Sequence, residues 1–270
     1  MGLENIVRAI LPTAAKPWLR RQRLVAARLL RRVGVNPGQS LLRRTTPINP
    51  IDYGESRGQC IDRYYIENFL AAHAKDVRGH VLDFADDNYA RKFGGNKTTK
   101  IDVLDLSPSN EQATIIADLA NGDNIPSDRF DSVLCTQVLH CIFDVEAAIR
   151  TLYRILKPGG VLLVTDACIQ KVDSVDLQNG EEFWRFTSLG LRRMFEKVFP
   201  GDQLEVHSYG NVLVAIAALH GLAVEDLTRT SLDVVDQDFE VLITLRAVKP
   251  LVGETTEVLA IANSASHLGD

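Results

Sequence analysis

Short apolar runs alternate with amphipathic segments along the middle of the chain, and this alternation indicates an α/β fold. Because most of the runs are separated by a helical pattern, they predict a mainly parallel sheet with helices on both faces. The predicted strands are residues 81–84, 100–106, 113–119, 131–136, 161–165, 203–209 and 239–248.

Helical spacing of apolar residues predicts three helices in the same region. The first follows Asp62, its predicted N-cap, and ends before Gly79. The second covers residues 145–156 and is stopped by Lys157-Pro158-Gly159-Gly160, a strong helix terminator. The third covers residues 212–222, between the last two predicted strands. This late strand pair predicts a seven-stranded, mostly parallel sheet with one antiparallel strand.

Charge divides the chain into three predicted parts. Ten of the eleven charged residues before Pro47 are basic and Glu4 is the acid, although the whole chain has a net charge of -5. We expect residues 1–50 to form a basic helical N-terminal extension and linker, 51–250 the main domain, and 251–270 a C-terminal tail. The extension suits an anionic membrane surface, a partner-docking arm or a solvated helix, and the pattern does not choose among them.

Composition narrows the class of protein. The acidic net charge does not favour nucleic acid as the main partner. No apolar run is long enough for a transmembrane helix, and charged residues stand where a signal peptide needs an apolar core. The four cysteines form no CxxC pair, and no histidine cluster has metal-ligand spacing, so we expect no metal. Reduced cysteines favour a cytoplasmic location, and the basic extension is compatible with a position peripheral to the membrane.

Three aspartates stand at the ends of the first three predicted strands. Asp83 ends the first, Asp105 the second, and Asp118 follows the third. In an open parallel sheet, ligands bind at the carboxyl ends of the strands, and an acid about 20 residues after the first strand holds ribose hydroxyls. The spacing from Asp83 to Asp105 therefore predicts a nucleoside site, although each aspartate has the alternative of capping a turn.

Three further segments carry a resemblance to a known family. Residues 128–134 resemble the fourth strand of class I S-adenosylmethionine-dependent methyltransferases, 136–144 the segment after it, and 154–162 the approach to the fifth strand. The likeness runs from about residue 62 to 248. It is strongest to the type 11 branch, which includes members associated with glycan synthesis, through Arg57-Gly58 and residues 61–67 and 183–187.

The resemblance implies a Rossmann-like fold, S-adenosylmethionine as cofactor, and methyl transfer to an oxygen or nitrogen of a small-molecule or glycan-like acceptor. It places Asp105 on the ribose, Asp118 and Leu119 on the adenine, and Tyr64 near the cofactor. The remaining implied cofactor residues are Asp83, Phe84, Ala85, Asp86, Leu106, Thr136 and Gln137. Asp83 has the alternative role of anchoring the loop amides without touching the cofactor.

The loop after the first predicted strand departs from the family pattern. Ala85 stands where the first glycine belongs, and Asp87 stands where the second belongs. Glycine there lets the backbone approach the ligand, and Asp87 brings a carboxylate near that of the cofactor. The main alternative is therefore a non-catalytic binding or scaffold protein on the same fold. A nicotinamide-dependent dehydrogenase is a weaker alternative because GxGxxG is absent.

Three residues are candidates for the acceptor side. His140 is the candidate general base, with a structural role as the alternative. Trp184 and Arg185 follow the fifth strand, where family members cover the acceptor. An indole stacks on sugar faces and a guanidinium pairs with phosphate, which would suit a glycan precursor. Their alternative is a lid segment that packs into the core.

Overall fold

The computed structural model describes residues 53–251. The predicted N-terminal extension, 1–50, and nearly all of the predicted tail, 252–270, lie outside the described residues. Within 53–251 no helix combines the length and the apolar character needed to cross a membrane.

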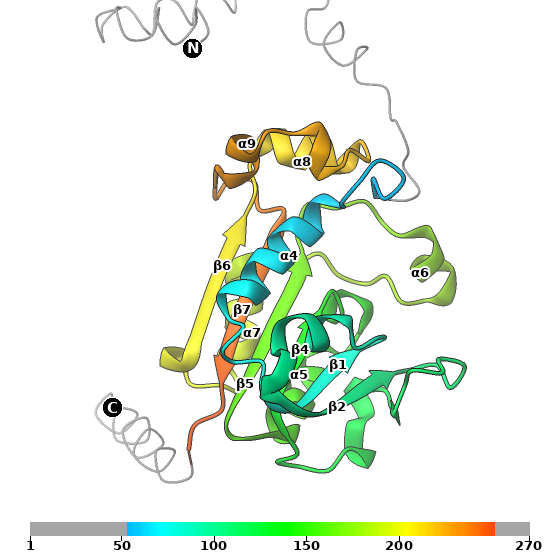
Figure 1. The fold of residues 1–270 in the computed structure, drawn as a ribbon, viewed down its shortest axis with the longest axis vertical. Coiled ribbons are helices and arrows are strands. Elements are labelled where there is room, and N and C mark those ends of the chain that lie inside the picture. Colours follow the sequence, from blue (N-terminus) through cyan, green and yellow to red (C-terminus); the bar gives the residue numbers. More distant parts are fainter. Residues whose placement is uncertain (1–52, 252–270) are drawn as a thin grey trace, which may run out of the picture. The chain divides into compact units, whose positions relative to one another are not determined.

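Seven strands form one sheet in the order β3-β2-β1-β4-β5-β7-β6 (Figure 1). Strand β7 runs antiparallel to both of its neighbours, and the other pairs are parallel. The predicted Rossmann-like sheet with one antiparallel strand is therefore confirmed. The strands are β1 Gly79–Phe84, β2 Thr98–Asp105, β3 Ile115–Ile116, β4 Phe130–Thr136, β5 Leu156–Ala167, β6 Leu204–Tyr209 and β7 Leu242–Val248.

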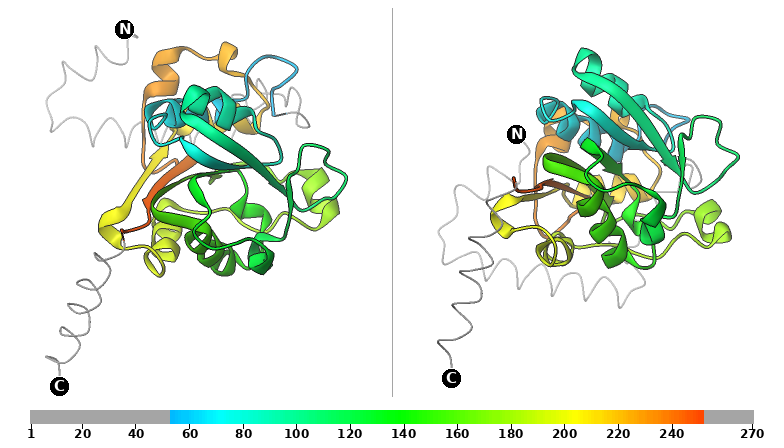
Figure 2. Two further views of the ribbon diagram at one scale, coloured as in Figure 1. Left: turned by 60° about the horizontal axis from the view of Figure 1, so that its bottom comes forward. Right: turned by 90° about the horizontal axis from the view of Figure 1, so that it is seen from below.

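Helices cover both faces of the sheet (Figure 2). The α-helices are α4 Ile61–Ala72, α5 Val145–Ile155, α6 Ser174–Asn179, α7 Ser188–Glu196, α8 Val212–Leu219 and α9 Arg229–Asp233. Short helical turns of other types are η1 Ala90–Gly94, η2 Gly95–Lys97, η3 Leu119–Asn124, η4 Leu139–Cys141, η5 Gly201–Gln203 and η6 Val224–Asp226.

The buried side chains divide into two cores because successive strand residues point to opposite faces. In β4, Val133 and Cys135 pack with α5 and α7, whereas Leu134 packs on the other face with α4 and α8. Leu162 and Leu163 of β5 divide in the same way. Both faces of the central strands are therefore apolar, which explains why these strands read as continuous hydrophobic runs.

Several predicted boundaries differ from the structure, and two of them have a clear physical reason. The first helix starts at Ile61 with Cys60 as N-cap, so Asp62 lies in the first turn instead of capping it. An acid there still interacts favourably with the helix dipole, which is why the sequence signal is similar. The predicted strand 113–119 reduces to Ile115–Ile116 because Asp118 accepts a hydrogen bond from Ala120 N and starts η3.

Candidate functional site

A cavity of about 860 Å³ opens beyond the carboxyl ends of β1, β2 and β4. Its apolar part includes Leu104, Leu119, Val138 and Ile142. Its charged lining residues are the four acids Asp105, Asp118, Asp144 and Glu181, and no described lysine or arginine lines it. The cavity is therefore an anionic site with an apolar wall.

The buried side chain of Asp83 anchors the loop after β1. Its side chain is 2% exposed and accepts hydrogen bonds from Phe84 N at 3.0 Å and Ala90 N at 2.9 Å. Burial raises its pKa to about 7, although the two amide hydrogen bonds oppose the shift. Asp83 does not line the cavity, so its position matches the anchoring alternative.

In the loop after β1, Ala85 has a backbone conformation that glycine adopts more easily. Ala85 has a φ of 64° in the left-handed region and lines the cavity. Its N–H donates to Leu104 O at 3.1 Å, which ties the loop to β2. Alanine at this position therefore preserves the turn at the cost of backbone strain.

The carboxylates of the next two residues, Asp86 and Asp87, interact with their own loop and do not line the cavity. Asp86 accepts a hydrogen bond from Asn88 N, and Asp87 forms an ion pair with Arg91 at 2.5 Å. Neither lines the cavity. The contact of Asp86 with a cofactor stays a prediction, and Arg91 compensates the charge of Asp87.

Asp105 lies at the end of β2 on the cavity wall. Its two carboxylate oxygens accept from Ser107 N at 2.7 Å and from Asn110 Nδ2 at 2.6 Å. The same Asn110 nitrogen is 2.6 Å from Ala85 O, so it connects the two loops that meet here. Each carboxylate oxygen has a second lone pair, which remains for a ligand hydroxyl.

The next wall of the cavity combines an acid with apolar surface. Asp118 caps η3 by accepting from Ala120 N at 2.9 Å, and Asn121 Nδ2 lies 2.7 Å from its other oxygen. Leu119 is buried below it, whereas Leu106 is 56% exposed on the opposite rim. This arrangement suits a flat aromatic base with an amino group.

Gln137, directly after β4, is the second residue with a left-handed backbone at the cavity, with a φ of 57°. Its N–H donates to Thr165 O, and its side-chain Nε2 is buried with no partner among the described residues. Thr136 lies one residue earlier and does not line the cavity. A strained backbone with an unsatisfied donor is typical of a ligand site.

Tyr64 lies away from this cavity. Its hydroxyl donates to Asp233 Oδ1 at 2.5 Å, and the Arg229 guanidinium lies 6.0 Å from its ring. Tyr64 therefore does not line the cavity, and its contact with the cofactor stays a prediction. Helix α4 turns this side chain toward α9 instead.

Trp184 and Arg185 are engaged by the protein itself. The Trp184 indole donates to Ile142 O at 3.0 Å and stacks on Phe143. Arg185 pairs with Glu182 at 2.7 Å and donates to Lys171 O. Both side chains are therefore held by protein contacts, although Trp184 is 37% exposed and does not pack into the core. Their roles at the acceptor stay predictions. The exposed rings that line the cavity are Phe143 and Phe183 instead.

His140 forms a buried dyad with Asp166. His140 is 8% exposed, and its Nδ1 lies 2.7 Å from Oδ1 of Asp166, which is fully buried in β5. Burial alone would lower the pKa of His140, but the hydrogen bonds to Asp166 and to the Cys141 thiol raise it to about 10. The ring is therefore protonated at neutral pH in this state, and general-base catalysis by His140 stays a prediction.

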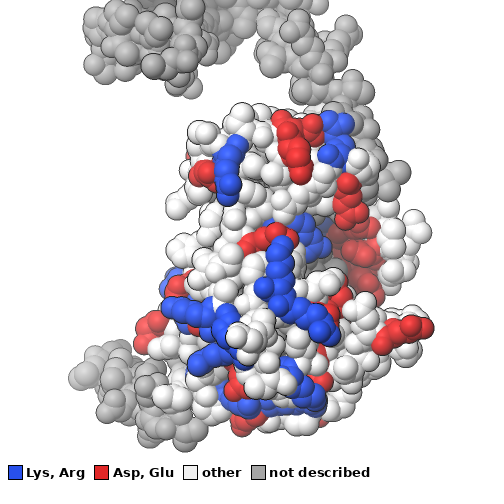
Figure 3. All heavy atoms as spheres, in the orientation of Figure 1, with Lys and Arg blue, Asp and Glu red and all other residues white. Residues whose placement is uncertain are grey.

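A second cavity of about 230 Å³ lies next to the dyad. Gln137 lines both this cavity and the larger one. The other lining residues are mostly polar and include five acids, Glu55, Asp62, Asp173, Asp176 and Glu182, with His140 and Arg63. Figure 3 shows acidic side chains gathered around a hollow of the domain.

Comparison with known proteins gives a family. Residues 64–162 match the family model described as "Methyltransferase domain". The match covers 99 of the chain's 270 residues and identifies this segment as a methyltransferase domain. No curated protein matches the chain.

Several solved structures resemble this methyltransferase. YcgJ from Bacillus subtilis is 16% identical over 68% of this chain and 99% of its own, with a TM-score of 0.43. An S-adenosylmethionine-dependent methyltransferase from Mesorhizobium loti is 18% identical, covering 67% and 95%, with a TM-score of 0.46. Phosphoethanolamine N-methyltransferase 2 of Haemonchus contortus, solved with S-adenosylmethionine, is 14% identical, covering 74% and 60%, with a TM-score of 0.47.

The larger cavity of the methyltransferase fits S-adenosylmethionine in volume and charge. About 860 Å³ is within the range of small-molecule sites. The four lining acids suit a cofactor that carries a positively charged sulfonium. The same charges would repel the pyrophosphate of a nicotinamide dinucleotide, which argues against the dehydrogenase alternative. In S-adenosylmethionine the sulfonium supplies an activated methyl group.

Sequence reasoning missed Asn110, Asp166, Phe143 and Phe183. Asn110 and Asp166 act through contacts between segments that lie 25 and 26 residues apart. Neither belongs to a recognisable motif. Phe143 lies within residues 136–144, and the resemblance of that segment to the family was the available signal.

Proposed function

We propose that this methyltransferase moves the methyl group of S-adenosylmethionine to an oxygen or nitrogen of a small, polar, glycan-like acceptor. The acceptor enters the second cavity, and the cofactor occupies the larger one. The observation that carries the proposal is that Gln137 lines both cavities. A cofactor in one and an acceptor in the other would therefore meet at this residue.

The roles of the cavity residues follow from their position. Asp105 accepts hydrogen bonds from the ribose hydroxyls, and Asp118 accepts from the adenine amino group while Leu119 packs on its ring. Ala85 lets the loop after β1 approach the methionine part. Gln137 Nε2 has no protein partner among the described residues, so it donates to the cofactor or the acceptor.

The acceptor class follows from the lining of the second cavity. About 230 Å³ admits one sugar-sized ring, and carboxylates with Gln170 offer acceptors and donors for several hydroxyls. Methyl transfer from a sulfonium needs chiefly positioning, so the proposal requires no base. Arg185 is paired with Glu182 and is not part of this acceptor site.

Calorimetric titration with S-adenosylhomocysteine tests the cofactor site. Asp105→Ala should weaken binding by roughly 10- to 100-fold, because hydrogen bonds to a charged group contribute about 1.5–3 kcal/mol. Asp123→Ala, an exposed acid outside the cavity, is the matched control and should leave binding unchanged.

Two results would contradict the proposal. Well-folded wild-type protein that binds neither S-adenosylmethionine nor S-adenosylhomocysteine would favour the scaffold alternative, which the Ala85 and Asp87 replacements motivate. Equal losses in Asp105→Ala and Asp123→Ala would remove Asp105 from the site. With binding established, release of S-adenosylhomocysteine in the presence of simple glycosides or of alkylamines distinguishes oxygen from nitrogen acceptors.

A further inference from the structure

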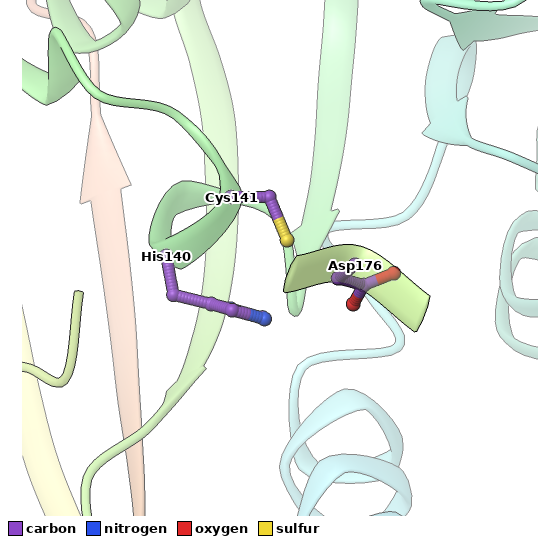
Figure 4. A group of neighbouring side chains, drawn as sticks. All are labelled: His140, Cys141 and Asp176. Atoms are coloured by element: carbon purple, nitrogen blue, oxygen red, sulfur yellow. The ribbon is translucent and has the colours of Figure 1, made fainter. Parts of the chain in front are cut away.

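Three side chains of metal-ligand type converge beside the second cavity. They are His140 and Cys141 of η4, directly after β4, and Asp176 of α6. One ligand atom from each lies within 4.8 Å of the others. Figure 4 shows the three side chains pointing toward a common space.

Asp166 fixes which nitrogen of His140 faces this space. Its Oδ1 lies 2.7 Å from Nδ1 of the ring, and its Oδ2 accepts the His140 N–H at 3.2 Å. Nδ1 therefore keeps its proton, and a metal ion would displace the proton of Nε2, the nitrogen that faces Cys141 and Asp176. A carboxylate behind a histidine in this way is the common arrangement around metal-ligating imidazoles.

Charge around the group favours a cation. Asp173 and Glu182 line the same cavity as His140 and Asp176, and Arg63 is the one lysine or arginine among the described lining residues. Arg185, which lies next in space to Glu182, is already paired with it. A divalent ion would therefore enter a site with a surplus of negative charge.

We propose that His140 Nε2, Cys141 Sγ and an Asp176 carboxylate oxygen bind one divalent transition-metal ion, best matched by zinc. Imidazole, thiolate and carboxylate are the ligands that zinc prefers, and three protein ligands leave a fourth position open. Cys141 lines the cofactor cavity, whereas His140 and Asp176 line the second cavity. The ion would thus lie between the two, with its open position available to an acceptor oxygen or nitrogen.

Metal binding is independent of the proposed methyl transfer and is tested without it. The full-length protein is treated with a chelator, and zinc chloride is titrated by calorimetry, with one ion per chain as the expected result. Cobalt(II) substitution should give a near-ultraviolet thiolate-to-cobalt absorption band, which reports directly on the sulfur ligand.

The ligand assignment rests on paired variants. Cys141→Ser should abolish the cobalt–thiolate band and the one-to-one zinc binding. Cys168→Ser is the matched control, because Cys168 is also a partly buried free cysteine but lies outside the group, and it should change neither. Asp166→Asn, which replaces the carboxylate behind the His140 ring, should weaken zinc binding by roughly 10- to 100-fold.

The possible results distinguish failure of the metal proposal from failure of the proposed function. Wild-type protein that binds no zinc while it binds S-adenosylhomocysteine would overturn the metal proposal and leave the proposed function intact. Zinc binding that survives in Cys141→Ser and Asp176→Asn would place the ion elsewhere. Circular dichroism of each variant shows whether a loss of binding reflects a loss of fold.

Discussion

At the scale of single residues, strain is concentrated at the cofactor cavity. Ala85 and Gln137 both have left-handed backbone conformations and both line the cavity, from loops that follow different strands. A left-handed conformation costs an L-residue roughly 1–2 kcal/mol, so the rest of the fold must hold it in place. For Ala85, the hydrogen bond to Leu104 O and the Asn110 contact provide that hold.

Replacing Ala85 with glycine should therefore stabilise the protein. Ala85→Gly removes the left-handed strain, and the greater chain entropy of glycine offsets about 0.5–1 kcal/mol of the gain. We expect the free energy of unfolding to rise by roughly 0.5–1 kcal/mol in chemical denaturation. Ala71→Gly, at an exposed position of α4, should lower it by about 1 kcal/mol. Losses of equal size in both variants would show that Ala85 is not strained.

The sequence placed some site residues well and others poorly for a physical reason. Asp105, Asp118 and Gln137 come directly at strand ends, and the parallel sheet brings strand ends together. Their location at the cavity could therefore be predicted, whereas their contacts with ligand stay predictions. The sequence did not indicate that Tyr64 lies outside the cavity, because its orientation depends on the packing of α4 against α9, which no local pattern encodes. The convergence of Asp176 with His140 likewise depends on how α6 folds back.

At the scale of elements, Asn211 joins two helices that cover one face. Its Oδ1 caps α8 by accepting from Leu213 N and Val214 N, both at 3.1 Å. Its Nδ2 donates to Ser231 O within α9 and to Val234 O directly after it, both at 2.8 Å. The side chain is 8% exposed, so water cannot easily replace these contacts.

Asn211→Ala should destabilise the protein by roughly 3 kcal/mol. The lost cap contributes about 1 kcal/mol, and two carbonyls without their donor contribute about 1 kcal/mol each. Thr228→Ala removes the cap of α9 and an exposed hydroxyl contact with Ser231, and it should cost about 1 kcal/mol. Thermal and urea unfolding measure both variants. Equal losses would mean that Asn211 acts as a cap alone.

At the scale of the whole molecule, the mostly parallel sheet could be predicted from the sequence because both its signals were local. Apolar runs gave the strands, and the helical patterns between them required parallel crossovers. Strand β5 is longer than its predicted range because it extends back to Leu156, where its pairing with Phe130 begins. Such pairing depends on a neighbour in space, so the ends of strands were less predictable than their presence.

The pH dependence of the free energy of unfolding reports on one buried acid, Asp83. Asp83 has a pKa of about 7 in the folded protein, because it is buried and Asp86 and Asp87 add to the shift, against a usual value of 3.8. A raised pKa means that the folded state holds the proton more tightly than the unfolded state. Asp83 therefore contributes stability that is complete below about pH 4 and is lost as the pH rises to about 7.

Asp83→Asn removes this titration while keeping a side chain of the same shape. The stability of the wild type relative to Asp83→Asn should fall by roughly 4 kcal/mol between about pH 4 and pH 8, since each pKa unit corresponds to about 1.4 kcal/mol. Urea unfolding of both proteins across this range measures the difference. His140, whose pKa is raised to about 10, titrates in both proteins and cancels. A constant difference across the range would mean that Asp83 stays ionised in the fold, held by the amides of Phe84 and Ala90.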